Sequence, residues 1–317
     1  MTRRRDASPP PATGPYCAMQ DLLALRAGAA RLQLQPPSRA LGELAGTLKS
    51  ARRGRGIEFE EVRAYMPGDD VRAIDWRVTA RTGRTHTRVF REERERPVFV
   101  LVDQRQSMFF GSRRTLKSVQ AVHAAALLAW ATLAGGDRIG GLVLGEHGHH
   151  EVRPQRDRHA ALALLGTCNE FNHRLGLPAA AARASPTLAD ALTSTRRVAR
   201  PGSLVFLVSD FGGWDDAAAQ QLHLLARHSE VCAIRVYDPL EQALPAHGRA
   251  SVSDGLRRLG IDAGDAGLRE RYGALFRAEH EALQAAFAHV RSPLIALATE
   301  ASALDVLGRY FNAGRAR

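Results

Sequence analysis

The chain has 317 residues, of which 45% are hydrophobic and 24% charged, a composition typical of a folded globular protein and not of a disordered one. It is long enough for two ordinary domains. No apolar run reaches the roughly 18 residues that a membrane span needs, and the proline-rich N-terminus has no apolar signal segment. Its only cysteines are three scattered ones, which argues against a disulfide framework or zinc knuckle. We therefore expect a cytoplasmic protein with no membrane span.

The formal net charge is +11, and all but two of the 44 basic residues are arginine, the exceptions being Lys49 and Lys117. An excess of arginine is typical of proteins that contact phosphate or nucleic acid. Here, however, the arginines are spread over the whole chain, and aromatic residues make up only 6% of it. Nucleic-acid binding therefore stays an alternative, and the arginine content is better explained by general composition.

The first part of the chain predicts three segments. Residues 1–16, rich in proline and arginine, are expected to form a disordered tail. Residues 17–51 are expected to form N-terminal helices, one from Met19 to Gln33 and a second from Ser38 to about Lys49. Residues 52–96 predict a small β-rich segment whose strands, Ile57 to Tyr65 and Thr85 to Phe90, flank a turn.

Residues 97–317 alternate between short apolar runs and helical patterns, which predicts one large α/β domain. Such alternation indicates a doubly wound, mostly parallel sheet with helices on both faces. The expected strands are Pro97 to Val102, Ile139 to Leu144, Ser203 to Ser209, Val231 to Tyr237 and Leu294 to Ala298. The expected helices lie at Leu116 to Leu133 and near Arg158 to Phe171, Leu188 to Val198, Asp215 to His228 and Leu268 to Val290.

Two of the predicted strands end in aspartate, at Asp103 and Asp210. The carboxyl ends of parallel strands share one edge of the sheet, where ligands bind in such folds, so we expect the two carboxylates to converge. Thr187 begins a predicted helix and adds a hydroxyl. Aspartate, serine and threonine oxygens are hard ligands that suit Mg²⁺ or Mn²⁺.

This arrangement resembles the von Willebrand factor A domain, which holds a metal-ion-dependent adhesion site at the same edge of its sheet. The resemblance implies a first loop of the pattern Asp-x-Ser-x-Ser, a threonine from a second loop and an aspartate from a third. Asp103, Ser107, Thr187 and Asp210 match that pattern. Arg105 stands in place of the middle serine, so the site is degenerate.

A guanidinium stays charged and cannot ligate a metal. We therefore hypothesise that Arg105 lies close to Asp103 or Asp210 and substitutes for the charge of the metal. The sequence then predicts no cofactor, and a Mg²⁺ or Mn²⁺ ion held by the four matching residues stays an alternative that Arg105 opposes. Gly212 and Gly213, beside Asp210, either donate backbone amides to an anion or form a plain loop.

A second resemblance covers most of the chain, from about Arg52 to Leu307. The run from Glu58 to Trp76, followed by Ala80-Arg81, is similar to the signature of the bacterial family called domain of unknown function 58. Ser209-Asp210-Phe211 and the run from Tyr237 to Glu241 also match it. The resemblance implies a β-rich segment followed by a von Willebrand factor A-like domain. It also implies that the chain is an adaptor or target of a MoxR-type AAA+ ATPase in the assembly or maturation of other proteins, because family members are typically encoded beside such ATPases.

Physical roles follow for the polar residues of this signature. Pro67 and Gly68 suit a tight turn. We expect three arginines to pair with three aspartates: Arg63, Arg72 and Arg81 with Asp69, Asp70 and Asp75. Trp76 is expected to anchor the segment against the main domain; direct contact with a partner is the alternative. The signature residues are Arg63, Tyr65, Pro67, Gly68, Asp69, Asp70, Arg72, Asp75, Trp76 and Arg81.

We interpret the protein as a non-enzymatic protein-interaction module, because the sequence shows no phosphate loop and no nucleophile paired with a base. A nucleic-acid-binding protein and a metal-dependent hydrolase are the alternatives. His147, His149 and His150 are expected at an exposed hairpin tip and not in a zinc site. The predicted partner-binding edge contains Asp103, Arg105, Ser107, Thr187, Asp210, Gly212 and Gly213, and no catalytic residue is predicted.

Overall fold

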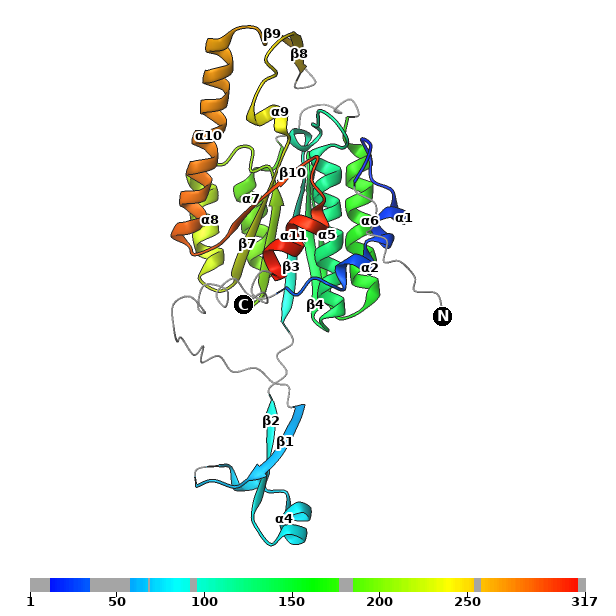
Figure 1. Ribbon diagram of the computed structural model, residues 1–317, viewed down its shortest axis with the longest axis vertical. Coiled ribbons are helices and arrows are strands. Elements are labelled where there is room, and N and C mark those ends of the chain that lie inside the picture. Colours follow the sequence, from blue (N-terminus) through cyan, green and yellow to red (C-terminus); the bar gives the residue numbers. More distant parts are fainter. Residues whose placement is uncertain are drawn as a thin grey trace. The chain divides into compact units, whose positions relative to one another are not determined.

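The computed structural model (Figure 1) describes residues 12–34, 58–67, 69–91, 96–176, 185–253 and 258–312. The chain divides into two compact units. The larger, here called the sheet domain, comprises Met1–Gly46 and Arg96–Arg317, and the smaller, here called the signature unit, comprises Thr47–Glu95. The predicted helix from Ser38 to about Lys49 lies outside the described residues.

The sheet domain is built on six strands in the order β10-β7-β6-β3-β4-β5. All neighbouring strands are parallel except β4 and β5, which form an antiparallel hairpin at one edge. The strands are β3 (Pro97–Gln104), β4 (Arg138–Gly145), β5 (Gly148–Gln155), β6 (Leu204–Ser209), β7 (Glu230–Tyr237) and β10 (Leu294–Ala298). The predicted doubly wound, mostly parallel α/β sheet is thereby confirmed.

Strand β5 is the one strand of the six-stranded sheet that the sequence did not predict, and a separate antiparallel pair, β8 (Arg249–Ser253) and β9 (Arg258–Asp262), was not predicted either. The residues of β5 are mostly exposed because it lies at the edge, so it lacks the continuous apolar run that marks the other strands of that sheet. His149 and His150 lie on this strand and His147 lies in the turn before it, and all three are exposed. The predicted hairpin is therefore present, with two of the histidines beyond its tip.

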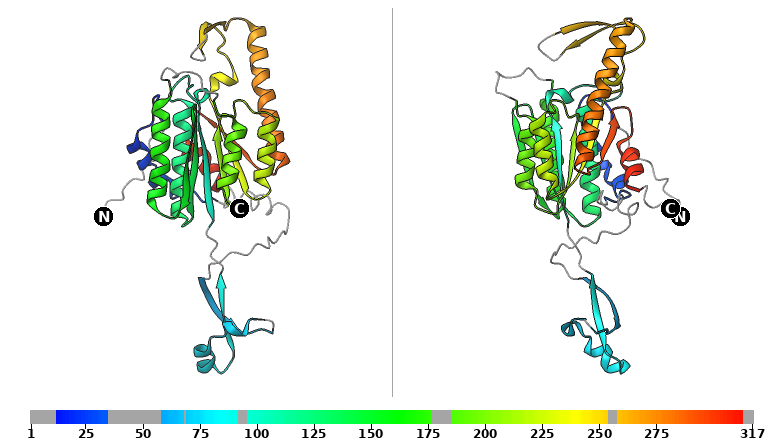
Figure 2. Two further views of the ribbon diagram at one scale, coloured as in Figure 1. Left: turned by 180° about the vertical axis from the view of Figure 1, so that it is seen from behind. Right: turned by 90° about the vertical axis from the view of Figure 1, so that its left-hand side faces the viewer.

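Helices cover both faces of the sheet (Figures 1 and 2). One core packs α5, α6, α1, α2 and α11 against the sheet, and the other packs α7, α8 and α10 against the opposite face. Helix α5 is buried almost all round, which explains its nearly continuous apolar sequence. The helices are α1 (Met19–Ala24), α2 (Arg26–Ala29), α5 (Lys117–Ala134), α6 (Arg158–Arg174), α7 (Leu188–Val198), α8 (Asp216–Ala226), α9 (Pro239–Gln242), α10 (Ala266–His289) and α11 (Ala303–Asn312).

The N-terminal segment packs on the sheet domain from residue 12 onward. Ala12 is buried, the amide of Gly14 donates to Arg114 O (2.9 Å), and the indole Nε1 of Trp130 donates to Leu22 O (2.9 Å). The prediction of a disordered tail through Tyr16 is therefore wrong for residues 12–16, whose backbone and apolar contacts fix them in place. Residues 1–11 lie outside the described part of the chain.

Two glycines of the sheet domain give a matched test of its packing. A Cβ on Gly141 in β4 would lie 2.5 Å from Val100 O, a backbone atom that cannot move aside. A Cβ on Gly166 in α6 would meet nothing within 4 Å. We expect Gly141→Ala to lower the free energy of unfolding by about 1–3 kcal/mol and Gly166→Ala to raise it by about 0.5–1 kcal/mol. Urea unfolding of both variants measures this, and equal effects would contradict the register of β4 on β3.

The signature unit consists of an antiparallel pair of strands, β1 (Glu58–Ala64) and β2 (His86–Arg91), with a short 3-10 turn, η1 (Val71–Ala73), and the helix α4 (Trp76–Thr82) between them. The predicted strands are therefore present. The helix was not predicted, because its seven residues lack an apolar stripe. Asp75 caps it by accepting the amides of Arg77 and Val78.

The predicted charge pairs of the signature unit form only in part. Arg63 donates twice to Asp69, at 2.9 and 2.8 Å, and this pairing lowers the pKa of Asp69. Asp70 accepts the backbone amide of Arg72 and caps η1, whereas Asp75 lies 3.5 Å from Arg88. Within the described residues, the predicted pairs of Arg72 and Arg81 with these aspartates are absent. Two of the aspartates are used instead to cap helical turns.

Two signature residues are exposed or only partly covered in this unit. Trp76 is 68% exposed, so it does not pack within the signature unit, and its contact with the sheet domain stays a prediction. The hydroxyl of Tyr65 donates to Asp69 O at 3.4 Å. Pro67 lies in the turn, and Gly68 lies outside the described residues.

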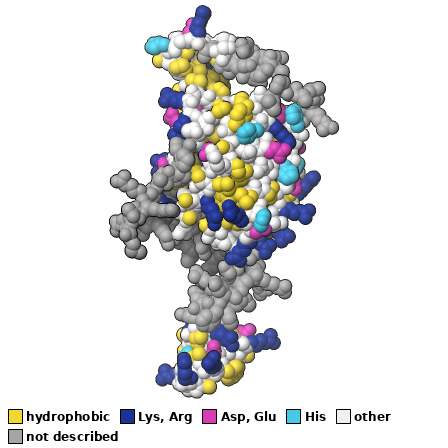
Figure 3. All heavy atoms as spheres, turned by 90° about the vertical axis from the view of Figure 1, so that its right-hand side faces the viewer, with side chains coloured by type: hydrophobic (Ala, Val, Ile, Leu, Met, Phe, Trp, Pro, Cys, Tyr) yellow, Lys and Arg dark blue, Asp and Glu magenta, His cyan; other side chains and the backbone are white. Residues whose placement is uncertain are grey.

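The described part of the chain bears on two expectations from the sequence, the absence of a membrane span and the dispersal of basic residues. Among the residues that the structure describes, no helix is both long and apolar enough to cross a bilayer. On the face drawn in Figure 3, Lys and Arg side chains occur at several separate places, with Asp, Glu and His side chains among them. The basic residues on that face are therefore dispersed, as the sequence distribution predicted.

Candidate functional site

The carboxyl ends of β3, β4, β6, β7 and β10 lie at one edge of the sheet, here called the carboxyl edge. The five strands are parallel, so their ends share this edge. Asp103 is the next-to-last residue of β3, Asp210 directly follows β6, and Asp238 directly follows β7. The parallel topology thus brings three aspartates from distant parts of the sequence to one edge, as expected for Asp103 and Asp210.

Asp103 and Arg105 form a compact ion pair at this edge. The side chain of Asp103 is fully buried, and that of Arg105 is 12% exposed. The guanidinium donates from Nη2 to Asp103 Oδ2 (2.7 Å) and from Nε to Oδ1 (3.0 Å), and Nη2 also donates to Gly212 O (3.0 Å). Ser209 Oγ donates to Asp103 Oδ2 as well (2.6 Å). Burial opposes the charge of Arg105, but Asp103 outweighs it and raises the pKa of the guanidinium.

Asp210 is held by a different cation, Lys117, the first residue of α5. Lys117 Nζ lies 2.8 Å from Asp210 Oδ2 and 2.6 Å from Glu241 Oε1, and the lysine side chain is only 3% exposed. The amide of Gly212 donates to Asp210 Oδ1 (2.8 Å). Burial opposes ionisation of Asp210, but Lys117 outweighs it, so the pKa of this carboxyl lies below its usual value. One buried lysine therefore joins two carboxylates from β6 and α9.

Asp238 anchors the loop that carries Glu241. It is fully buried and accepts hydrogen bonds from Ser112 Oγ (2.5 Å), Thr299 Oγ1 (2.6 Å) and the amide of Leu240. In return, its own amide donates to Glu241 Oε2 (2.9 Å). This reciprocal cap fixes Glu241 where Lys117 can reach it.

Two residues predicted for the metal pattern serve other purposes. The backbone amide and the hydroxyl of Thr187 both donate to Asp190 Oδ2 (3.0 and 2.8 Å) in the capping box at the start of α7. The hydrogen bond from the amide first, and that from the hydroxyl after it, lower the pKa of Asp190. Ser107 lies in the short turn η2 (Gln106–Met108) and is exposed. Both lie at the carboxyl edge by topology, but neither joins Asp103 and Asp210 in one described cluster.

The loop of Phe211, Gly212 and Gly213 after Asp210 contacts both aspartate–cation pairs of the site. Phe211 adopts a left-handed φ of 60°, with its amide bonded to Ser209 Oγ (2.8 Å), and Gly213 has a φ of 76°. Gly212 uses its amide on Asp210 and its carbonyl on Arg105. The proposed role of this loop as an external anion site is therefore wrong for the amide of Gly212, because an internal carboxylate already occupies it.

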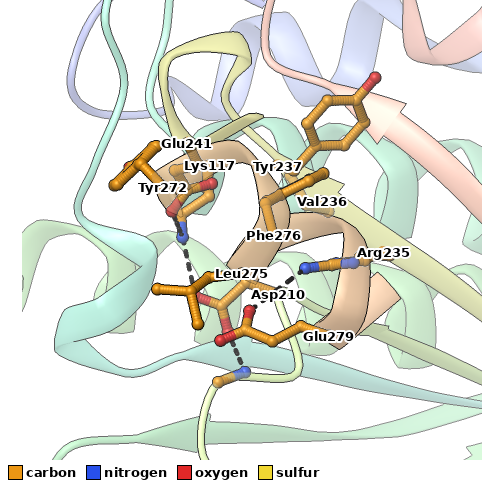
Figure 4. A pocket seen from close by; sticks show the side chains of 11 residues that line it. Lys117, Asp210, Arg235, Val236, Tyr237, Glu241, Tyr272, Leu275, Phe276 and Glu279 are labelled. Atoms are coloured by element: carbon orange, nitrogen blue, oxygen red, sulfur yellow. Dashed lines mark hydrogen bonds and ion pairs between the residues drawn. The ribbon is translucent and has the colours of Figure 1, made fainter. Parts of the chain in front are cut away.

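A pocket of about 280 Å³ opens beside Asp210 (Figure 4). Residues of β7, α9 and α10 form its walls together with Lys117 and the Asp210 loop. Its floor includes Arg235, which lies 4.5 Å from the ring centre of Phe276 and 3.8 Å from Glu279 Oε2. The lining residues are Lys117, Asp210, Gly212, Arg235, Val236, Tyr237, Glu241, Tyr272, Leu275, Phe276 and Glu279.

These residues, as they are folded, do not fit a divalent cation. Both oxygens of Asp103 accept bonds from Arg105, and both oxygens of Asp210 already have donors. A cation would have to displace a guanidinium or an ammonium group whose charge already neutralises each carboxylate. In the described part of the chain, no group of three or more His, Cys, Asp or Glu side chains is arranged to hold a metal.

Sequence reasoning missed Lys117, Glu241 and Arg235. A usable signal existed for each: Lys117 is one of only two lysines and begins a buried helix, and Arg235 is a single charge inside an apolar strand. Glu241 lies in the second signature run. The sequence does not show that these residues lie close together in space. Lys117 is more than 90 positions from Asp210, and Lys117, Arg235 and Glu241 lie on three different elements.

With this geometry established, comparison with known proteins identifies the family. The model of the family described as "Protein of unknown function DUF58" matches residues 61–282. The chain belongs to the DUF58 family. Uncharacterized proteins of Mycobacterium tuberculosis and Mycobacterium bovis are 31% identical to it over 290 residues, which is 90% of this chain and 88% of theirs. The two signature runs quoted above are therefore runs of a DUF58 protein.

Two solved structures are similar to parts of this DUF58 chain. The conserved hypothetical protein BatB from Bacteroides thetaiotaomicron is 12% identical with a TM-score of 0.41, and the match covers 68% of this chain and 97% of that one. The SpRpn10 VWA domain is 12% identical with a TM-score of 0.38, and the match covers 68% of this chain and 95% of that one.

Proposed function

We propose that this DUF58 protein is a non-enzymatic protein-interaction module that binds its partner through the carboxyl edge of the sheet. The observation that carries the proposal is the Asp103–Arg105 pair. The guanidinium of Arg105 lies where von Willebrand factor A domains hold a metal ion, and it neutralises the buried carboxylate of Asp103. Such a site supplies a rigid, charged surface and no activated nucleophile.

The surface around this pair supports docking of another protein. Ser107, Gly212 and Gly213 are exposed beside the guanidinium, and loops at such an edge commonly carry function because a rigid scaffold positions them. We propose that the partner presents an acidic group there, since the guanidinium of Arg105 bonds directly to the carbonyl of Gly212 in the exposed loop. A MoxR-type AAA+ ATPase in the cytoplasm is the partner that the family resemblance favours.

The test measures binding of the purified protein to the co-encoded MoxR-type ATPase, with the nucleotide state of the ATPase held constant. Arg105→Glu reverses the charge at the edge and is expected to weaken binding by about tenfold or more, or 1.4 kcal/mol. Ser107→Glu adds an acidic group on the exposed turn without touching Asp103 and is expected to weaken binding in the same direction. Arg196→Glu, on the exposed last turn of α7, is the charge-matched control and should bind like the wild type.

Three outcomes would overturn parts of this proposal. Unchanged binding in both Arg105→Glu and Ser107→Glu would place the docking surface elsewhere, with the segment from Arg63 to Trp76 the next candidate. No binding to any co-encoded ATPase would refute the adaptor role. Binding to arbitrary duplex DNA that falls steeply with salt would favour the nucleic-acid alternative instead.

A further inference from the structure

The pocket beside Asp210 contains one charged group that the fold leaves without hydrogen-bond partners. Arg235 is 5% exposed, and its Nε and Nη1 atoms have no acceptor among the described residues. Its third nitrogen, Nη2, faces Glu279 Oε2 at 3.8 Å, which is an ion pair too long to be a hydrogen bond. Burial is the main cause of a lowered pKa at Arg235, and the surrounding carboxylates do not offset it.

Three other charged groups of the pocket, Lys117, Asp210 and Glu241, already have hydrogen-bond partners. Lys117 Nζ binds Asp210 and Glu241, the second oxygen of Asp210 accepts the Gly212 amide, and the second oxygen of Glu241 accepts the Asp238 amide. Among the residues that line the pocket, the buried side-chain donors without an acceptor are therefore Nε and Nη1 of Arg235. A buried polar group without a partner is unusual in a folded protein and calls for a ligand or another explanation. Because the unsatisfied group is a cation, the ligand that fits is an anion.

Glu279 is the carboxylate that lies nearest Arg235 as an ion pair, but it does not form a hydrogen bond with it. Its side chain is 72% exposed, so it can move into solvent at small cost. Figure 4 shows the Arg235 guanidinium and the Glu279 carboxylate joined by a dashed line across the pocket. The ring of Phe276 lies over the guanidinium, with its centre 4.5 Å from Cζ, and restrains the plane of the side chain.

We propose that this pocket binds the carboxylate of an Asp or Glu side chain of a partner polypeptide, which displaces Glu279 and pairs with the Nη1 and Nη2 atoms of Arg235. A planar carboxylate matches the end of a guanidinium through two parallel hydrogen bonds. A phosphate fits less well, because Asp210, Glu241 and Glu279 line the same pocket and repel a second negative charge. Leu275, 65% exposed on the pocket wall, provides an apolar contact for the chain that carries the acidic residue.

This inference rests on the proposed function in one respect, that the occupant belongs to a protein, but its test needs no ATPase. The probe is N-acetyl-glutamate α-amide, which carries one carboxylate, and the comparison compound is the glutamine analogue, which carries none. Titrations are followed by amide chemical shifts in two-dimensional NMR spectra of the full chain. We expect saturable shifts around Arg235 and Phe276 with the glutamate probe alone.

Two variants separate ligand binding from a structural role of Arg235. Arg235→Met keeps the apolar stem and removes a buried charge that lacks partners, so the fold is expected to persist while probe binding falls below detection. Glu279→Gln removes the competing carboxylate and is expected to tighten probe binding by up to about fivefold, the range set by an exposed ion pair. Glu281→Gln, on the same helix and exposed, is the matched control and should leave probe binding unchanged.

The inference fails if the glutamine analogue binds as well as the glutamate probe, if Arg235→Met retains binding, or if neither the wild type nor Glu279→Gln shows saturable shifts. Acetate that binds as tightly as the glutamate probe would identify a free small carboxylate, and not a protein side chain, as the occupant. Probe binding that depends on Arg235 while the ATPase does not bind would refute the AAA+ partnership and leave the pocket assignment standing.

Discussion

Replacing Lys117 by methionine is expected to lower the free energy of unfolding by about 3–5 kcal/mol, the usual cost of removing one partner from a buried ion pair. Methionine keeps most of the apolar stem, so the main loss is the ammonium that joins Asp210 and Glu241 at 2.8 and 2.6 Å. Both carboxylates then lose their neutralising cation in a nearly buried site. Urea unfolding measures the effect, with Arg197→Met on the exposed surface of α7 as the control.

The same substitution is expected to change how stability depends on pH. Burial opposes ionisation of Asp210, but Lys117 lowers the pKa of its carboxyl below the unfolded value. A carboxyl with a lowered folded pKa stabilises the protein above its unfolded pKa and loses that contribution as pH falls through its folded pKa. The stabilisation that Asp210 contributes in the wild type should therefore decline as pH falls below about 4, the pKa of an unfolded aspartate, and be lost below its lowered folded pKa, so the difference between wild type and Lys117→Met should narrow there.

A double variant distinguishes this cause from simple loss of packing. Asp210→Asn removes the charge that Lys117→Met leaves unpaired, so the pair of changes should destabilise less than the sum of the two single ones. Strictly additive effects, or a Lys117→Met effect below about 1 kcal/mol, would contradict a buried Lys117–Asp210 pair, because exposed pairs have effects of that size.

The second large effect is expected at Arg105. Arg105→Ser restores the serine of the adhesion-site pattern and leaves Asp103, which is fully buried, without its guanidinium. Without metal, we expect a loss of about 3 kcal/mol in the free energy of unfolding. With Mg²⁺ or Mn²⁺ at about 100 times its Kd, binding to the folded state should restore about 2.7 kcal/mol.

Thermal melts of both proteins, with the ions and with EDTA, test this expectation. The wild type should show little stabilisation by either ion, because Arg105 donates to both oxygens of Asp103. Strong stabilisation of the wild type by Mg²⁺ or Mn²⁺ would refute the substitution of a guanidinium for a metal. A variant that gains nothing from metal would show that Thr187, whose hydroxyl caps α7, cannot complete the coordination.

Much of the fold follows from local sequence patterns. Five apolar runs separated by amphipathic or apolar helices are enough to predict a parallel sheet with two helical layers, because such strands are buried on both faces. The edge strand β5 was not predicted, because its residues are mostly exposed and form no apolar run. Helix α4 was missed because seven residues carry too little periodicity.

For the candidate site, the sequence by itself determined that Asp103 and Asp210 lie at one edge, since parallel strands end on the same side. It also suggested that Arg105 lies close to Asp103 or Asp210, and the structure shows that its partner is Asp103. Only the tertiary structure decided which cation holds which carboxylate. Lys117 reaches Asp210 and Glu241 because α5 begins near the ends of β6 and β7. Nε and Nη1 of Arg235 lack hydrogen-bond partners because α10 covers the guanidinium with Phe276 and places only the exposed Glu279 near it. Distances between residues far apart in the chain arise from packing, and local patterns do not encode them.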